Sequence, residues 1–255
     1  MLQVVNRALA AGKHVIEEKP VAGTLEEAVA SIKLYRSNRS SGSPAASGLW
    51  MLAENSRYEQ VFHDACAMAP SVLGTLIKLD LVVNLPMDTA NKYYNSQWRR
   101  SPGVMITESS VHFIAALRMM TGACGLGEAK EVASRTFHAK PDLSGPDSVV
   151  GVVAFEKGAA PASVSISLAA SNVDFSLKAC GTEGVIEVTR GGWGGSRASY
   201  SLTWKGKQDT EPQTKSYTFT GVATEFSSFL DLVSGVIECS VLNLHRNLLL
   251  CGLSG

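Results

Sequence analysis

The segment Lys13–Pro20, with the sequence Lys-His-Val-Ile-Glu-Glu-Lys-Pro, constrains the fold of this chain more than any other. Val15 and Ile16 are β-branched residues typical of a central strand, and Pro20 must end strand pairing because it has no N–H. Lys19 is therefore placed at the carboxyl end of a buried strand. In open α/β sheets ligands bind at that edge, so Lys19 is either a functional side chain or a solvated lysine at a strand end.

Helical patterns flank this strand on both sides. Apolar residues before it recur at helical spacing and are followed by Gly12 in the position of a left-handed C-cap. After it, Thr24 and Glu27 form a capping box at the start of a second amphipathic helix. Helix, strand and helix make a fragment of a doubly wound parallel sheet. The parallel neighbours of this strand are not found upstream, so we expect an N-terminally incomplete domain.

Residues 11–20 resemble the Glu-Lys-Pro segment of the Gfo/Idh/MocA oxidoreductases, the relatives of glucose-fructose oxidoreductase and inositol dehydrogenase. In that family the segment closes a Rossmann domain, and its lysine faces nicotinamide and substrate. A short strand over residues 49–53 and the polar residues after it resemble the next Rossmann strand, although Asn55 serves equally well as a helix cap. The resemblance implies NAD or NADP as cofactor and these cofactor-binding residues: Glu18, Lys19, Pro20, Asn55 and Arg57.

The rest of the chain predicts a second domain. Residues 59–69 read as a helix ended by Pro70, and residues 75–83 alternate as a half-buried strand with Ile77 on the inner face. Seven further strand patterns separated by turn residues follow residue 130, which favours one large, open, mostly antiparallel sheet. Two amphipathic helices, one facing inward through Phe226, Phe229, Leu230 and Val233 and one over residues 237–248, would flank it. We assign residues 1–57 to the Rossmann remnant, the C-terminal part of an NAD(P)-binding domain, and residues 58–255 to a substrate and oligomerisation domain.

The helical pattern over residues 108–122, closed by Gly122, carries Glu108 and His112 four residues apart on one face. Such a pair is either a general acid/base pair or an ordinary helix-stabilising pair. The family reads Asp-x-Gly-x-His here, so Glu108 replaces the aspartate and Ser110 the glycine. The resemblance implies that His112 moves the hydroxyl proton, that Glu108 orients His112, and that Lys19 hydrogen-bonds the reacting oxygen.

Residues 93–100, Tyr-Tyr-Asn-Ser-Gln-Trp-Arg-Arg, suit stacking on and hydrogen bonding to a polyhydroxylated ligand, or simple surface packing. The family carries a comparable Trp-Arg loop over its substrate site. This implies that Trp98 and Arg99 position the substrate.

Composition excludes several classes of protein. The 23 basic and 23 acidic residues balance, which gives no reason to expect nucleic acid or anionic lipid as partner. No apolar run approaches a membrane span, so we expect a soluble, cytoplasmic protein. The five cysteines lack any C-x-x-C pair and the five histidines lack ligand spacing, so we expect free thiols and no metal site. Residues 37–48 read as a flexible loop.

The resemblance thus implies a NAD(P)-dependent oxidoreductase that transfers hydride to or from a carbon of a sugar, polyol or diol. Lys19, Glu108 and His112 are expected to converge on one cleft, and the sheet domain is expected to form a homo-oligomer. No G-x-G-x-x-G fingerprint occurs, so the chain as given should bind a nicotinamide dinucleotide weakly, and a version extended upstream should bind it tightly. This absence and the changed Glu108 and Ser110 favour the alternative, a non-catalytic oligomerisation or ligand-binding protein.

Overall fold

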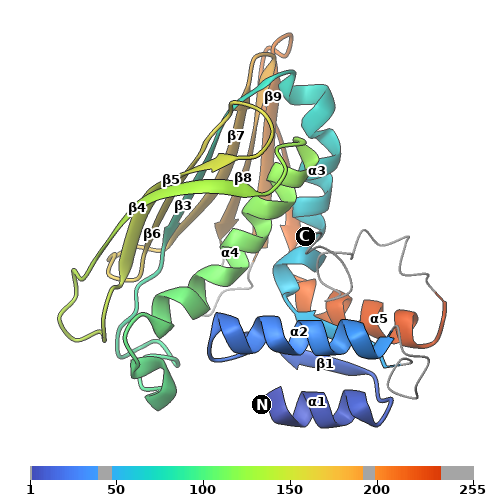
Figure 1. Cartoon of the computed structure of the whole chain (residues 1–255). Helices are drawn as coiled ribbons and strands as arrows, with labels where there is room; N and C mark the ends of the chain where they lie inside the picture. Colours follow the sequence, from blue (N-terminus) through green and yellow to red (C-terminus); the bar gives the residue numbers. More distant parts are fainter. Residues whose placement is uncertain (1, 40–47, 192–198, 237–255) are drawn as a thin grey trace. The chain divides into compact units, whose positions relative to one another are not determined.

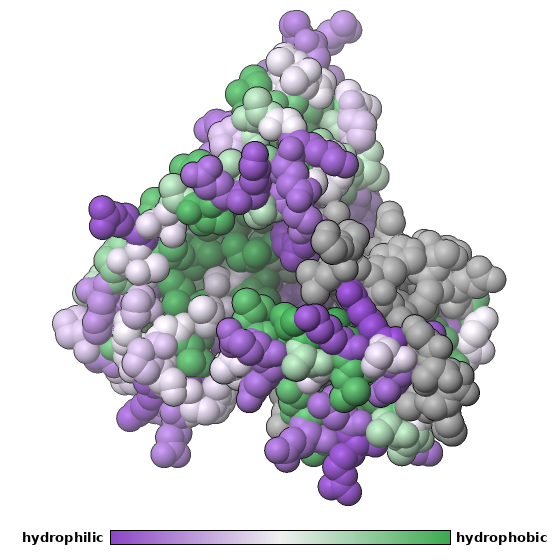
Figure 2. Space-filling view, viewed as in Figure 1, coloured by the Kyte–Doolittle hydropathy of each residue, from purple (hydrophilic) through white to green (hydrophobic). Residues whose placement is uncertain are grey.

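The computed structural model describes residues 2–39, 48–191 and 199–236. The chain divides into two compact units, each described here by itself (Figure 1). Unit 1 comprises the described residues of Met1–Asn55 and Val222–Gly255, and unit 2 comprises those of Ser56–Gly221. Figure 2 shows hydrophilic residues over most of the projecting parts of the visible surface and hydrophobic residues grouped in its more recessed parts.

Unit 1 is built on two parallel strands. Strand β1 (Val15–Glu18) pairs with β2 (Trp50–Ala53) in the register Val15↔Trp50, and helices α1 (Leu2–Ala10), α2 (Leu25–Arg39) and most of α5 (Gly221–Val233) belong to the same unit. Gly12 has φ +70 after α1, as predicted for a C-cap, and the Glu27 N–H donates to Thr24 Oγ1 at 3.2 Å. The strand, its flanking helices and their caps are thus those that the sequence predicts.

A small polar network joins the strands of unit 1 to α2. The Tyr35 hydroxyl donates to the Gly48 carbonyl at 3.1 Å and accepts the Trp50 N–H at 3.0 Å. The Trp50 indole N–H donates to Glu17 Oε2 at 2.9 Å, inside a core of Val5, Leu9, Tyr35 and Trp50. Buried polar groups need such partners, so this network fixes how α2 packs on β2.

Unit 2 is an eight-stranded sheet in the order β10-β9-β8-β7-β3-β6-β5-β4. All neighbouring strands pair antiparallel except β3 and β6, which run parallel. The large, mostly antiparallel sheet is therefore confirmed. The strands are β3 (Leu76–Asn84), β4 (Ala129–Phe137), β5 (Ser148–Phe155), β6 (Ala162–Ser167), β7 (Asp174–Gly181), β8 (Gly184–Gly191), β9 (Ser199–Gly206) and β10 (Gln213–Thr218).

Two helices cover one face of this sheet, α3 (Gln60–Leu73) and α4 (Val104–Ala123) (Figure 1). Two short 3₁₀ helices, η2 (Asn55–Tyr58) and η3 (Gln97–Arg100), precede them. Alternate strand residues such as Leu79, Leu81 and Val83 are fully buried beneath α3 and α4. Burial of this one face accounts for most of the core.

The opposite face of the sheet is lined by hydroxyl-bearing side chains and by charged side chains, which form two ion pairs on its central strands. Ser163 and Ser165 of β6 pair with Asp80 and Val82 of β3 on this face, and Val150 and Val152 of β5 are its large exposed apolar residues. The sheet therefore alternates apolar-in and polar-out, as expected when one face is packed and the other is not.

Ile77 departs from the predicted strand phase. It is 53% exposed, whereas Leu79, Leu81 and Val83 are buried as expected. The β3–β7 register shifts between Leu76 and Lys78. A bulge of this kind changes which face a side chain occupies, and a hydrophobicity pattern does not reveal it.

Pro70 does not end α3, which continues to Leu73. The proline lies in the last turn, where its missing N–H costs one hydrogen bond and its ring points to solvent. Gly74, with φ +63, follows the helix instead. Similarly, Gly122 lies inside α4, and Cys124 caps that helix ahead of Gly125 at φ +71.

The buried side of α5 also differs from the prediction. Phe229 is buried as expected, but Phe226, Leu230 and Val233 are exposed, and Leu232 and Glu225 take the inner positions. Apolar residues occur on more than one side of this helix, so its pattern does not define a single face.

Two predicted elements, a loop and a helix, lie partly or wholly outside the described residues. Residues 37–39 belong to α2 rather than to a loop, while residues 40–47 and the helix predicted over 237–248 lie outside the described residues. Among the described helices, none is long and apolar enough to cross a membrane.

Candidate functional site

The carboxyl ends of β1 and β2 form one edge of unit 1. Glu18 and Lys19 stand at the end of β1, and Glu54 and Asn55 follow β2 in the parallel register. Lys19 is partly buried and precedes a cis Lys19–Pro20 bond. Charged and amide side chains from two neighbouring strands therefore meet at the edge where α/β sheets bind ligands.

Glu225 of α5 is buried against this same edge, with 3% of its surface exposed. Burial, and then the carboxylates of Glu54 and Glu18, raise the pKa of Glu225 to about 8, against a hydrogen bond from the backbone of Glu54. One carboxyl oxygen, Oε1, has no hydrogen-bond partner among the described residues. Glu225 is thus a protonated acid at neutral pH, held beside two strand ends.

The start of α2 tests whether the described part of unit 1 fits a dinucleotide pyrophosphate. Thr24 already caps this helix, and Glu26 and Glu27 occupy its first turn. Carboxylates at a helix N-terminus use the favourable end of the dipole and repel a phosphate. The start of α2 is therefore not suited to bind a dinucleotide pyrophosphate.

In unit 2, Glu108 of α4 binds Arg99 of η3 through both carboxylate oxygens. The Arg99 Nε and Nη2 atoms donate to Glu108 Oε2 and Oε1 at 2.7 and 2.9 Å. The two side chains are only 12% and 9% exposed. A bidentate pair with so little solvent is among the stronger ionic contacts in proteins and fixes η3 onto α4.

The remaining donors and faces of Arg99 are also engaged. Its Nη1 atom donates to Ser96 Oγ at 3.0 Å, and its guanidinium lies 4.4 Å from the Tyr93 ring and 4.1 Å from the Trp98 ring. Trp98 itself is 51% exposed. Arg99 therefore organises the 93–100 segment, and Trp98 is the member of the predicted pair that offers free surface.

Comparison with known proteins gives relatives for both units. No family model matches the sequence. The chain is 33% identical to "Dehydrogenase FPY6" of Fusarium mangiferae over 153 residues, 59% of this chain and 42% of that protein. The chain thus spans less than half the length of this relative.

Solved structures match over most of the chain. An oxidoreductase from Thermotoga maritima has a TM-score of 0.73 at 22% identity over 93% of this chain and 65% of its own. An inositol dehydrogenase homolog from Azotobacter vinelandii, in complex with NADH and myo-inositol, has a TM-score of 0.66 at 18% identity, covering 87% and 55%. The chain has the Gfo/Idh/MocA oxidoreductase fold. The predicted resemblance is confirmed at the level of the fold.

A third solved structure with this Gfo/Idh/MocA fold is that of a regulator of transcription. The transcriptional regulator Gal80p of Kluyveromyces lactis matches with a TM-score of 0.70 at 13% identity, over 91% of this chain and 62% of its own. The Gfo/Idh/MocA fold therefore does not by itself specify an enzyme.

The predicted site residues divide between the two units. Glu18, Lys19, Pro20 and Asn55 lie in unit 1, whereas Arg57, Trp98, Arg99, Glu108 and His112 lie in unit 2. Within unit 2 the structure brings Trp98, Arg99 and Glu108 into one cluster, and His112 follows Glu108 by one turn of α4 with its side chain partly buried. The convergence of Lys19 with Glu108 and His112 stays a prediction, as does the orienting role of Glu108.

Two residues that the structure places at candidate sites, Glu225 and Arg100, were not predicted from the sequence. Glu225 gave one signal, a carboxylate in the first half of a largely apolar helix. Arg100 gave none that separates it from Arg99, because adjacent residues of the same type differ only in the direction in which the fold points them. Cys66, Cys124 and Cys180 are free thiols as expected, and burial raises the pKa of Cys66 to about 12, which makes its thiol unreactive. Among the described residues no cluster is suited to a metal ion.

Proposed function

We propose that this chain is part of a NAD(P)-dependent oxidoreductase that acts on a hydroxyl-bearing carbon of a sugar, polyol or diol. The observation that carries the proposal is the partly buried His112 on α4, one turn from a carboxylate fixed by Arg99, within a fold matched by oxidoreductases. The structural relative that contains NADH and myo-inositol supports a nicotinamide cofactor and a polyhydroxylated substrate.

Hydride exchange with a nicotinamide is the chemistry that the cofactor would supply. His112 accepts the proton of the substrate hydroxyl during oxidation and returns it during reduction. Lys19 donates a hydrogen bond to the same oxygen and stabilises the charge that develops there. Glu108, held in place by Arg99, stabilises the imidazolium form of His112 electrostatically. Asn55 and Arg57 would hold the cofactor beside Glu18, Lys19 and Pro20.

His112→Asn tests the proposal directly. In a version of the protein extended upstream so that it binds NAD⁺ or NADP⁺, the variant should lose roughly 10²- to 10⁴-fold in kcat with a panel of polyols, because general acid/base catalysis contributes that much. His63→Asn is the matched control, since His63 is an exposed histidine on α3 whose ring nitrogen meets only the Arg57 carbonyl at 2.7 Å. Equal activity of the two variants would remove His112 from the mechanism.

The pyrophosphate of the cofactor is proposed to be held outside the described residues, because the start of α2 is capped and acidic. Titrating the chain with NADH and with NADPH, followed by nucleotide fluorescence, should give only weak binding, whereas a version extended upstream should bind tightly. Tight, saturable binding of either nucleotide by the chain itself would contradict this reading of α2.

We also propose that unit 2 mediates homo-oligomerisation through the uncovered face of its sheet. Val150 and Val152 stand exposed amid small hydroxyl-bearing side chains, which allow close approach of a second sheet. Light scattering at micromolar concentration should give a multimer, and Val152→Lys should dissociate it. A wild-type monomer would rule the interface out.

A non-catalytic ligand-binding or regulatory protein is the second candidate function. The likeness to Gal80p favours it. A protein of this kind would bind a sugar or nucleotide without turnover, and His112→Asn would leave that binding unchanged.

A further inference from the structure

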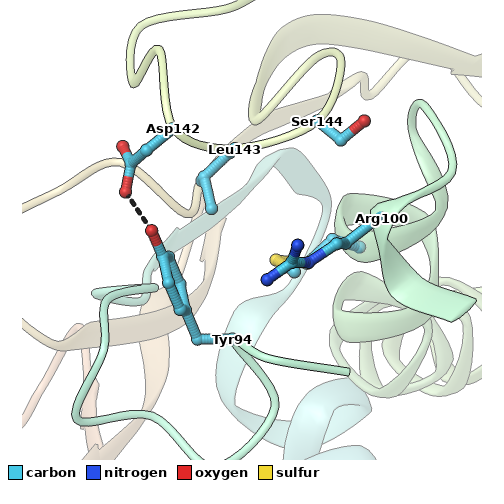
Figure 3. A pocket seen from close by; sticks show the side chains of 6 residues that line it. Tyr94, Arg100, Asp142, Leu143 and Ser144 are labelled. Carbon is cyan, nitrogen blue, oxygen red and sulfur yellow. Dashed lines mark hydrogen bonds between the residues drawn. The ribbon is translucent and has the colours of Figure 1, made fainter. Parts of the chain in front are cut away.

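A pocket of about 340 Å³ lies in unit 2, between the 93–100 segment and the loop that joins β4 to β5 (Figure 3). Such a volume lies at the small end of the range for ligand sites. Its lining residues are Tyr94, Arg100, Met105, Asp142, Leu143 and Ser144.

The wall formed by the β4–β5 loop is fixed against the start of α4. Gly145 has φ +78, and a Cβ added there would lie 2.8 Å from both the Gly103 nitrogen and the Pro102 Cα. The loop approaches this closely only because residue 145 is glycine. Asp147, 1% exposed, further anchors the loop by accepting the N–H groups of Ala139 and Lys140.

The acidic group of the pocket is already engaged. The Tyr94 hydroxyl donates to Asp142 Oδ2 at 2.6 Å, and the Lys140 ammonium lies 3.8 Å from the same oxygen. The Tyr94 hydrogen bond and Lys140 lower the pKa of Asp142, so it is ionised at neutral pH. Its other oxygen remains able to accept a hydrogen bond from a ligand hydroxyl.

The basic group of the pocket is available. Arg100 is exposed and forms no hydrogen bond or ion pair with any other residue in the part of the chain that the structure describes, unlike its neighbour Arg99. Figure 3 shows its guanidinium reaching toward the Tyr94 ring below Leu143. A guanidinium at the mouth of a small pocket matches a carboxylate through two parallel hydrogen bonds.

We propose that this pocket binds a small polyhydroxylated carboxylic acid, with its carboxylate on Arg100 and its hydroxyls on Asp142 and Tyr94. A monoanion fits better than a phosphate dianion, because Asp142 lies on the opposite wall from Arg100 and would repel a second negative charge. The apolar walls, Leu143 and Met105, are each 6% exposed and suit the carbon chain.

The pocket also lies along α4 from His112. Met105 and His112 are seven residues apart, which places them on the same side of a helix with roughly 10 Å between them along its axis. An acid of about six carbons held at Arg100 would extend toward the histidine. This step rests on the proposed function, whereas binding of the acid itself does not.

Calorimetric titration of the chain with D-gluconate, without cofactor, tests the pocket. Gluconate should bind, the matched neutral polyol D-glucitol should bind at least tenfold more weakly, and Arg100→Gln should weaken gluconate binding at least tenfold, about 1.4 kcal/mol. Arg100→Lys should restore only part of the affinity because it keeps the charge without the fork. Arg118→Gln, which removes an exposed arginine of α4 paired with Glu128, should change nothing.

Several outcomes overturn the proposal. Undetectable gluconate binding, equal binding by Arg100→Gln and wild type, or equal affinity for D-glucitol would each do so. Tighter, Arg100-dependent binding of glucose 6-phosphate would replace the carboxylate with a phosphate. If gluconate binds through Arg100 but a longer version of the protein that binds NAD⁺ or NADP⁺ does not oxidise it, the pocket stands and the proposed function is contradicted. If that version oxidises neutral polyols but gluconate does not bind, the proposed function stands and the pocket is contradicted.

Discussion

The two units each bury a glutamate on a helix, and they treat its charge in opposite ways. Glu108 on α4 of unit 2 faces the guanidinium of Arg99 and forms a bidentate ion pair. Burial raises the pKa of Glu225 on α5 of unit 1 to about 8, and the facing carboxylates of Glu54 and Glu18 add to this rise. Burial raises the pKa of a carboxyl group, and the neighbouring charge adds to that rise or opposes it according to its sign. Unit 2 is stabilised by an ionised carboxylate, and unit 1 by a protonated one.

The largest expected effect comes from breaking the unit 2 pair. Glu108→Gln leaves the nearly buried Arg99 charge without its counterion and should lower the free energy of unfolding by about 4 kcal/mol. Glu128→Gln is the matched control, since its pair with Arg118 is 52% and 48% exposed and should matter by less than about 0.5 kcal/mol. Urea denaturation of both variants measures the difference. Equal urea midpoints for Glu108→Gln and Glu128→Gln would show that the Arg99–Glu108 pair adds nothing to stability.

Glu225→Gln tests the buried glutamate of unit 1 through the pH dependence of the stability of that unit. Since the folded pKa of Glu225, about 8, lies above its unfolded value of 4.5, its contribution is complete below pH 4.5 and is lost as the pH rises to 8. The wild type should therefore lose on the order of 3 kcal/mol of unit 1 stability across this window, and the variant should not. The free energy of opening, obtained from hydrogen exchange of the β2 amides at pH 5 and pH 8, measures this loss of stability. A control variant, Glu26→Gln at the exposed start of α2, should keep the wild-type pH dependence.

A smaller effect is expected where a carboxylate is paired near the surface. Burial opposes ionisation of Asp64, but Lys215, Tyr217 and Gln60 together lower its pKa to about 2. Its stabilising contribution is present above pH 3.8 and is lost as the pH falls through 2. Asp64→Asn should cost about 1 kcal/mol at pH 7, because solvent screens the link between α3 and β10. An acid titration of unfolding that is unchanged in the variant would contradict the assignment.

Much of the secondary structure could be predicted because it depends on local periodicity. Strand β1, its flanking helices, the capping box at Thr24 and the left-handed Gly12 all follow from residues close in sequence. The eight-stranded sheet followed from alternation and turn residues. The errors lie where local signals conflict with packing, as at the bulge before Lys78 and on the several apolar sides of α5.

The sequence by itself determined which elements form, since hydrogen-bond period and side-chain alternation are properties of neighbouring residues. Only the tertiary structure decided which charges meet. Arg99 and Arg100 are adjacent and chemically identical, yet one is held between two rings and Glu108 while the other lies at a pocket formed with a loop more than forty residues away. Glu225 likewise becomes a neutral acid because the fold buries it, and because β1 and β2 end beside it. Charge states depend on distance and solvent exposure in three dimensions, and a one-dimensional pattern contains neither.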